Sequence, residues 1–377
     1  MIVLRAARLF DGETLTENAT VAIDDGRFVA VPQDGDVVDL GDVTLLPGLI
    51  DTHQHLVFNG QGTLEEQVVG FTDDELAERA RANALVARRA GITTIRDLGD
   101  RNYVTLPLRD DPTLPTLVCS GPPLTITGGH CWYLNGECDD ADALVEMVAA
   151  HKARGCDVIK IMVTGGILTP TFPMWKSQFD RGDLQRLVDA AHAEGLPVAA
   201  HCHGKQGILD AIAVGVDTLE HCSFFTEGGV SDPDEVSVAA VAESGIVVSA
   251  TLGAVPGFDP PPIVQANIET LLRALGEFVR LGGNLVVGSD AGIGPGKPHN
   301  VLPYAAVQLA EVGMPPLDAL KAMTSRSAAA IGLGDRKGRV APGYDADLVA
   351  VAGNPLDDMA ALHDVRAVYL RGAKIEL

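Results

Sequence analysis

The chain has 377 residues, a formal net charge of −23 and 46% hydrophobic residues. This length suffices for one large domain and a smaller one, and the composition is that of an ordinary globular protein. Because phosphate surfaces attract clustered Lys and Arg, the acidic charge argues against nucleic acid and anionic membranes as partners. We expect a small-molecule substrate, and a homo-oligomer remains an open alternative.

The N-terminal segment does not have the pattern of a targeting sequence. Arg5 and Arg8 interrupt its apolar residues, which argues against a signal peptide or a membrane anchor. No run of about 18 apolar residues occurs, so no spanning helix is expected. The six cysteines show neither disulfide-scaffold nor CxxC spacing. We therefore expect a cytoplasmic protein.

Residues 1–46 are typical of short strands joined by turns, with Asp25-Gly26 as a hairpin signal. After them, strand-like apolar runs alternate with amphipathic segments. The predicted helices include 72–91, 139–155 and 181–195, each with a polar start and Gly at its end. The runs are "TLLPGLIDTHQH", "ITTIRDLG", "TLVCSGPPL", "DVIKIMVTG", "LPVAAHCHG", "DTLEHC", "IVVSATLG" and "LVVGSDAG".

These eight runs predict the fold class. Buried strands that alternate with helices over roughly 280 residues indicate an α/β protein with a (β/α)₈ TIM barrel over residues 47–339. An open, doubly wound sheet shares the alternation, but the absence of a GxGxxG turn favours the barrel. Residues 340–377 return to short strands. We expect them to pair with residues 1–46 in a small β-sandwich domain built from both chain termini.

The strand ends carry the residues that point to chemistry, because active sites of such barrels lie at the C-terminal ends of the strands. Asp51, His53 and His55 end the first run and, with a period of two, share one face. A lone HxH is a weak signal. Other strand ends carry His201, His203, His221 and Asp290. Together, these side chains predict a metal site.

Lys160 lies in the middle of the apolar run "DVIKIMVTGG". A buried ammonium is costly unless it is paired or its chemistry changes. One alternative is an ion pair with Asp97 or Asp157. The other is reaction with CO₂, which gives an anionic carbamate whose two oxygens can each bind one of two divalent ions. The surrounding metal-competent residues favour the carbamate.

The ordered set "PGLIDTHQH", Lys160 in "VIKIM", His201, His221 and Asp290 resembles the amidohydrolase superfamily over the whole chain. The motifs "GITTIRDLG", "GGH", "KIMVTGG" and "GVDTLEH" resemble its imidazolonepropionase-related branch. That branch contains binuclear Xaa-Pro and Xaa-Arg/Lys dipeptidases. Imidazolonepropionase itself lacks the bridging lysine and uses one metal, so Lys160 argues against that activity.

The resemblance implies two divalent metal ions. His53, His55 and Asp290 would hold one, His201 and His221 the other, and carbamylated Lys160 would bridge them. Zinc is the default for such ligands, while manganese and iron are alternatives. Whether His203 contacts metal or substrate is left open, and Asp51 is expected to orient a histidine N–H.

The resemblance also implies a mechanism. A hydroxide shared by the two ions would attack a carbonyl, and Asp290 would pass its proton to the leaving amine. His130 and His221 would help to hold the developing oxyanion. The favoured reaction is hydrolysis of an amide-type C–N bond in a dipeptide or N-acyl amino acid. Alternatives are hydrolysis of a lactone, carbamate, urea or organophosphate, deamination, or a non-enzymatic barrel.

Substrate contacts are expected from the loops after the third and fourth strands. His130, Trp132 and Tyr133 lie in the first loop and Trp175 in the second. Tryptophan on a loop usually packs on something, which is either a substrate or the core of a lid. Candidate partners for a substrate carboxylate are Arg101, Lys176 and Lys205.

Overall fold

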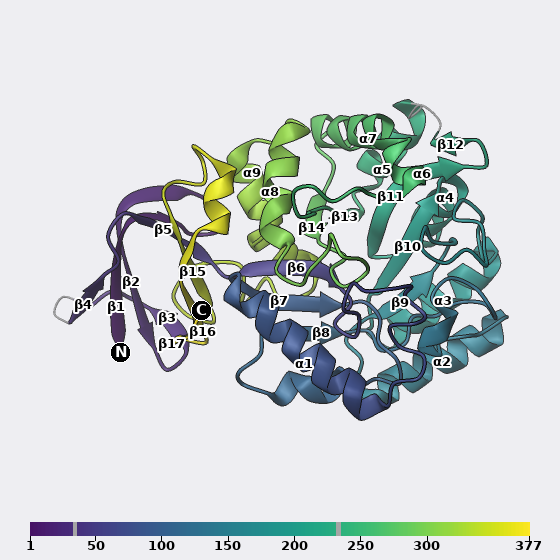
Figure 1. Cartoon of the computed structure of the whole chain (residues 1–377), viewed down its shortest axis with the longest axis horizontal. Helices are drawn as coiled ribbons and strands as arrows, with labels where there is room; N and C mark the ends of the chain where they lie inside the picture. The colour runs from purple at the N-terminus through teal and green to yellow at the C-terminus, as the bar shows by residue number, and fades with distance from the viewer. Residues whose placement is uncertain (33–35, 231–234) are drawn as a thin grey trace.

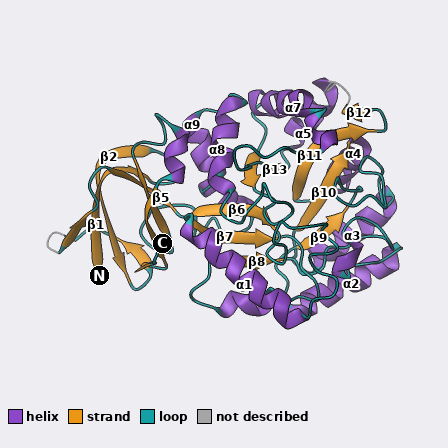
Figure 2. Cartoon of the chain, in the orientation of Figure 1, coloured by secondary structure: helices purple, strands orange, loops and turns teal. Residues whose placement is uncertain are grey.

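The computed structural model describes residues 1–32, 36–230 and 235–377. Figure 1 shows a β-rich part that contains both termini, beside a larger part in which helices surround strands. The α/β class predicted from the alternating runs is confirmed by this arrangement (Figure 2).

Strands from both ends of the chain meet in one sheet. Among the described residues it has eight strands, in the order β17-β16-β15-β5-β1-β2-β3, with β4 beside β1. They are β1 (Ile2–Phe10), β2 (Leu15–Asp24), β3 (Arg27–Val29), β4 (Val37–Asp39), β5 (Val43–Pro47), β15 (Leu348–Ala352), β16 (Val365–Leu370) and β17 (Ala373–Lys374). The pairing is continuous through one sheet, so the predicted sandwich is not confirmed.

The predicted hairpin at Asp25-Gly26 is confirmed. Asp24 pairs with Arg27 across the turn, and both turn residues have positive φ, 44° at Asp25 and 76° at Gly26. This geometry matches the right-handed twist of the flanking strands, which is why Asp-Gly is favoured there.

Each of the predicted apolar runs contains a parallel strand in the described part of the chain. These strands are β6 (Leu49–Gln54), β7 (Ile92–Asp97), β8 (Thr116–Cys119), β9 (Ile159–Met162), β10 (Val198–Gly204), β11 (Thr218–Thr226), β13 (Val247–Thr251) and β14 (Leu285–Gly288). The first run divides at Gly48. Its first half joins the terminal sheet as β5, and its second half continues as β6.

The parallel strands form two hydrogen-bonded sheets. One contains β6-β7-β8, and the other contains β14-β13-β11-β10-β9, with β12 (Gly229–Val230) antiparallel to β11. Isolated parallel bridges, Gln54 with Ala291 and Leu124 with Ile161, join the two sheets. Because the ladder is interrupted at both places, closure of the predicted barrel is not confirmed.

Helices cover the outer side of these strands (Figure 2). The longer ones are α1 (Asp73–Arg89), α2 (Ala141–Arg154), α3 (Arg181–Ala193), α4 (Lys205–Val214), α5 (Glu235–Ser244), α7 (Ile268–Arg280) and α8 (Leu302–Glu311). Shorter helices are α6 (Pro262–Gln265), α9 (Pro316–Ala322), α10 (Ser325–Ala330), and the 3₁₀ turns η1 (Leu106–Asp110), η2 (Trp132–Leu134) and η3 (Met359–His363). None of the helices in the described ranges is long and apolar enough to cross a membrane.

The three predicted helices are confirmed as α1, α2 and α3, and their ends carry the expected caps. Thr72 and Glu75 form a capping box at the start of α1, and Gly155 ends α2 in the left-handed conformation with φ 84°. With helices outside, the strands are covered on both faces, and β6, β7, β9 and β10 are buried at every position. A polar side chain in these strands is therefore removed from bulk water.

The turn between α1 and β7 generates a stability test. At Gly91, with φ +83°, an added Cβ would lie 2.6 Å from Val349 Cγ2 of β15. At Gly195, the equivalent position after α3, φ is +69° and an added Cβ would meet nothing within 4 Å. Both Ala variants should lose about 1–2 kcal/mol of unfolding free energy from left-handed strain.

Gly91→Ala should lose about 1–3 kcal/mol more than Gly195→Ala, because its methyl group overpacks the contact with Val349. Urea unfolding of the two variants and the parent protein measures this difference. Equal losses would contradict close packing between this turn and the terminal sheet.

Candidate metal centre

A cavity of about 890 Å³ lies where the parallel strands end. Side chains from β6, β9, β10 and β11 and from the segments after β8 and β14 line it. The structure brings together in its lining the predicted metal and catalytic residues His53, His55, His130, Lys160, His201, His203, His221 and Asp290.

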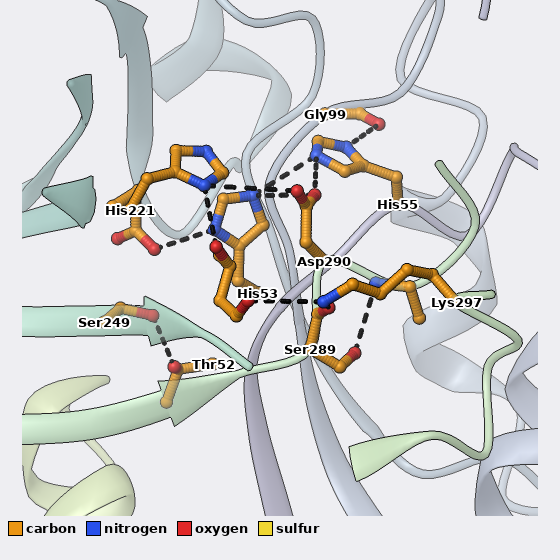
Figure 3. A network of polar contacts seen from close by, with 12 residues as sticks. Thr52, His53, His55, Gly99, His221, Ser249, Ser289, Asp290 and Lys297 are labelled. Carbon is orange, nitrogen blue, oxygen red and sulfur yellow. Dashed lines mark hydrogen bonds and ion pairs between the residues drawn. The ribbon is translucent and has the colours of Figure 1, made fainter. Parts of the chain in front are cut away.

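The first cluster of possible ligands contains His53, His55 and Asp290 (Figure 3). The Nε2 atoms of the two histidines are 3.3 Å apart. Asp290 Oδ1 lies 3.5 Å from His53 Nε2 and 3.4 Å from His55 Nε2. Two imidazole nitrogens and one carboxylate oxygen that converge in this way suit a single divalent cation.

Hydrogen bonds at the far side of each ring fix its orientation. His53 Nδ1 donates to Glu220 Oε2 at 2.8 Å, and His55 Nδ1 donates to the Gly99 carbonyl oxygen at 3.3 Å. Because both acceptors lack a proton to give, each Nδ1 carries the hydrogen. Each Nε2 therefore presents its lone pair toward Asp290, as a metal ligand requires.

Glu220, on β11, is itself held in place. Its Oε1 accepts from Arg96 Nη2 and from Thr218 Oγ1, both at 2.7 Å, and its side chain is fully buried. Burial alone would raise the pKa of Glu220, but Arg96 and the hydrogen bond from His53 hold that pKa well below its usual value. An ionised carboxylate is thus fixed behind the His53 ring.

Asp51 was expected in this orienting role, and the prediction is wrong. Its carboxylate accepts from Ser289 N at 2.8 Å, Ser289 Oγ at 2.6 Å, Gln54 Nε2 at 2.7 Å and the His53 backbone, and from no histidine ring among the described residues. Asp51 therefore ties the end of β6 to the segment after β14. Glu220 and Arg96 have the orienting role instead. Their signals in the sequence are an acidic residue directly before His221 and an arginine inside an apolar run.

The second cluster contains His201, His203 and His221, with one possible ligand atom from each within 4.8 Å of the others. His201 Nε2 donates to the Gly165 carbonyl at 3.1 Å, and His221 Nδ1 lies 2.9 Å from Thr251 Oγ1. Burial lowers the pKa of both rings well below the usual range. Neutral imidazoles with one nitrogen free are suited to bind a cation.

His203 is itself a member of this cluster. Its ring stacks on His221 with centroids 4.5 Å apart, and its Nδ1 lies 3.0 Å from Ser223 Oγ. Burial lowers its pKa to about 4. His203 also lines the cavity.

Lys160 is fully buried in β9, and its Nζ has no hydrogen-bond partner among the described residues. The ion-pair alternative has no support. Asp157 bonds to Arg109, and Asp97 accepts backbone N–H groups of Gly99 and Leu56. Burial lowers the pKa of Lys160 to about 8. A buried amine without a hydrogen-bond partner among the described residues thus lines the same cavity as the two clusters.

The backbone at two of these residues is strained. His221 and Asp290 have φ of 69° and 55°, in the left-handed region. Such conformations cost about 1–3 kcal/mol each for residues other than glycine and are concentrated at functional sites. The Asp290 N–H donates to the His53 carbonyl at 2.7 Å, which holds the carboxylate over the first cluster.

His130 lines the cavity beside the second cluster. Its ring centroid lies 4.5 Å from that of His201, and its Nδ1 lies 2.8 Å from Thr169 Oγ1. Burial lowers its pKa to about 3, so the ring is neutral. At Gly166 an added Cβ would lie 2.2 Å from His130 Cε1, so the absence of a side chain there allows the ring its position.

The predicted aromatic contacts are placed elsewhere. Trp132, Tyr133 and Trp175 are not among the described residues that line the cavity. Tyr133 is buried with its hydroxyl 3.6 Å from Cys131 Sγ, Trp132 packs against the main core, and Trp175 is 36% exposed. This supports the packing alternative for the first two. The cavity has instead an apolar wall, which was not predicted from the sequence. It includes Leu252, Phe258, Leu271, Leu272 and Leu275.

The cations suggested for a substrate carboxylate, Arg101, Lys176 and Lys205, are likewise outside the described lining. Lys176 lies over the Phe172 ring at 5.6 Å, and Arg101 donates to the Val68 carbonyl. Lys297, which was not predicted as a site residue, lines the cavity.

The contact between Glu220 and His53 generates a test of metal affinity. Glu220→Gln removes the negative charge behind the ring and should weaken binding of a divalent ion about 10- to 100-fold. Competition with a chelating dye measures the affinity, and circular dichroism checks the fold. Asp142→Asn, a change at an 81% exposed side chain, serves as control. Unchanged affinity in Glu220→Gln would contradict the orienting role.

Comparisons with known proteins agree with this geometry. A model of the amidohydrolase family matches residues 44–374. Ochratoxinase from Aspergillus niger is 28% identical over 372 residues, covering 86% of this chain and 73% of the relative. Imidazolonepropionase from Deinococcus deserti is 25% identical over 410 residues, covering 98% and 93%.

A solved structure of a Xaa-Pro dipeptidase with bound methionine in its active site superposes with a TM-score of 0.86 and 26% identity, over 100% of this chain and 99% of that one. The resemblance seen in the motifs is thereby confirmed. The chain belongs to the amidohydrolase family and is a hydrolase that acts on carbon–nitrogen bonds.

Proposed function

We propose that the protein is a binuclear metal-dependent hydrolase that cleaves an amide-type C–N bond in a small molecule, with a dipeptide or an N-acyl amino acid as substrate. The observation that carries this proposal is the buried, unpartnered amine of Lys160 beside two ligand clusters. The names of the ochratoxinase and Xaa-Pro dipeptidase relatives support the amide bond as the target.

In this proposal His53, His55 and Asp290 would hold one ion, and His201 and His221 would hold the other. Lys160, as a carbamate, would supply the anionic group that both ions need. Besides burial, the charge of Lys160 lowers the pKa of His53 in one cluster and of His201 and His221 in the other, which supports its closeness to both. The ions, zinc by default and manganese or iron as alternatives, supply hydroxide near neutral pH and polarise the amide carbonyl when bound.

Asp290 acts as the proton carrier. Burial alone would raise its pKa, but the charge of Lys297 acts to lower it. A carboxylate that is ionised has a free oxygen that can accept a proton. It then donates that proton to the leaving amine. His130 is neutral and in the lining, and its Nε2 would hold the oxygen of the amide carbonyl as negative charge develops on it. His221 could share this role only from the ring nitrogen that does not bind metal, and that nitrogen would then leave Thr251.

A closed (β/α)₈ barrel over residues 47–339 is the scaffold that this proposal assumes. The bridges from Gln54 to Ala291 and from Leu124 to Ile161 support closure, because each joins the edges of the two parallel sheets. The strand ends around such a barrel all face one mouth, which accounts for the meeting of ligands from distant parts of the chain.

Metal content tests the bridged centre. Elemental analysis of the protein should give close to two divalent ions per chain, and removal with a chelator should abolish amide hydrolysis. Lys160→Ala should bind at most one ion and lose at least about 1,000-fold in kcat, with partial recovery when a short carboxylic acid replaces the carbamate. A single ion whose binding is insensitive to Lys160→Ala would contradict the bridged centre.

Asp290→Asn tests the proton carrier. Its kcat should fall about 100- to 10,000-fold, because the amide cannot accept the proton. Since Asp290 is also a proposed ligand, turnover is measured on samples whose metal content equals that of the parent protein. Full turnover at equal metal content would exclude the proton-transfer role.

A further inference from the structure

Lys297 lies in the segment after β14 and contributes a cation to the cavity wall (Figure 3). Four charged side chains line the cavity within the described residues: Lys160, Asp259, Asp290 and Lys297. If Lys160 is carbamylated, Lys297 is the cation that remains in this lining to meet an anionic group of a substrate.

The ammonium of Lys297 is fixed at the strand ends. Its Nζ donates to the Ser289 carbonyl at 2.9 Å and to the Thr251 carbonyl at 3.2 Å. An ammonium has three N–H groups, so these two bonds leave one for a further acceptor. The carboxylates of Asp290 and Asp51 lie close enough to attract the ammonium, but no hydrogen bond or ion pair joins either of them to Nζ within the described residues. The side chain is only partly buried, and its uncovered part faces the cavity.

Two carbonyl bonds alone would make Lys297 a structural tie between β13 and β14. A neutral donor could serve as such a tie without the cost of holding a charge away from water. Asp290 and Asp51 attract this charge, but neither accepts the third N–H in the described part of the chain. That N–H can therefore bind an anion that arrives with the substrate.

The position of Lys297 indicates which part of the substrate carries that anion. Ser289, whose carbonyl holds Nζ, is the residue next to Asp290, and Asp290 delivers a proton to the leaving amine in the proposed reaction. In an amino acid the carboxylate is attached to the carbon next to the amine. A leaving amino acid with its nitrogen at Asp290 can thus place its carboxylate on the Lys297 side.

The wall beside Lys297 is apolar. Leu252 directly follows Thr251, and Phe258 and the α7 residues Leu271, Leu272 and Leu275 continue the lining. The three α7 leucines are only half-buried within the protein, because they face the cavity. Figure 1 shows α6 and α7 beside β11 and β13. A cavity of about 890 Å³ with such a wall has room for a bulky apolar side chain.

We propose that the leaving group is an α-amino acid with a large apolar side chain, whose carboxylate binds Lys297 and whose side chain packs on Leu252, Phe258, Leu271, Leu272 and Leu275. This specificity rests on the proposed amide hydrolysis and narrows its substrate class. Lys297 thereby determines the preference for a carboxylate, and the apolar wall determines the preference for a large apolar side chain.

Three substrates test the two halves separately in the metal-loaded enzyme: N-acetylphenylalanine, N-acetylphenylalaninol, which lacks the carboxylate, and N-acetylglycine, which lacks the side chain. The parent enzyme should prefer N-acetylphenylalanine over each of the others about 10- to 100-fold in kcat/KM. Lys297→Met should lose the preference over the alcohol and keep the preference over glycine. Leu272→Asn should show the reverse pattern.

Arg101→Met and Lys176→Met are matched controls, since these cations lie outside the described lining and should keep both preferences. Equal rates on the acid and the alcohol in the parent enzyme, an undiminished preference in Lys297→Met, or its loss in either control would overturn the assignment. Should Lys297→Met not fold, inhibition of the parent enzyme by phenylalanine and by phenylalaninol gives the same comparison. Absence of hydrolysis of any amide would instead contradict the proposed function.

Discussion

The buried amine of Lys160 is the constraint on which the rest of the site depends. It lies in a strand that is buried at every position, and no described group offers it a hydrogen bond. Neutral histidines surround it, because burial lowers their pKa as well. Many nitrogen lone pairs and little negative charge thus meet in one cavity. In the proposed function, a carbamate on Lys160 and two divalent ions would balance these groups.

Hydrogen bonds from the surrounding structure hold the candidate ligands in position. Arg96 holds Glu220, Glu220 holds the His53 ring, and Asp51 ties the strand of His53 to the segment that carries Asp290. Each of these contacts joins parts of the chain that are far apart in the sequence. Because the contacts are buried in a low-dielectric interior, the hydrogen bonds are strong and their loss is costly. These contacts stabilise Asp290 in a left-handed backbone conformation that is strained for a residue other than glycine.

Periodicity and strand ends sufficed to predict the parallel strands, the first three helices and the residues that meet in the cavity, because each of these signals is local. The roles of Glu220, Arg96 and Lys297 could not be predicted from the sequence, because they depend on neighbours contributed by other parts of the chain. For Trp132 and Tyr133 the loop position leaves substrate contact and lid packing as alternatives, and the structure packs both against the core. The apolar wall could not be predicted, because the sequence around Leu252 and in α7 has the same pattern as ordinary core segments.

The central claim, a carbamate on Lys160 that completes a two-metal centre, is tested most directly by ¹³C nuclear magnetic resonance. Metal-free protein is reconstituted with zinc in the presence of ¹³C-labelled bicarbonate. The account predicts a carbamate carbon signal that appears with the metal, disappears when the metal is chelated, and is absent from Lys160→Ala. A fully metal-loaded, active enzyme without this signal would contradict it.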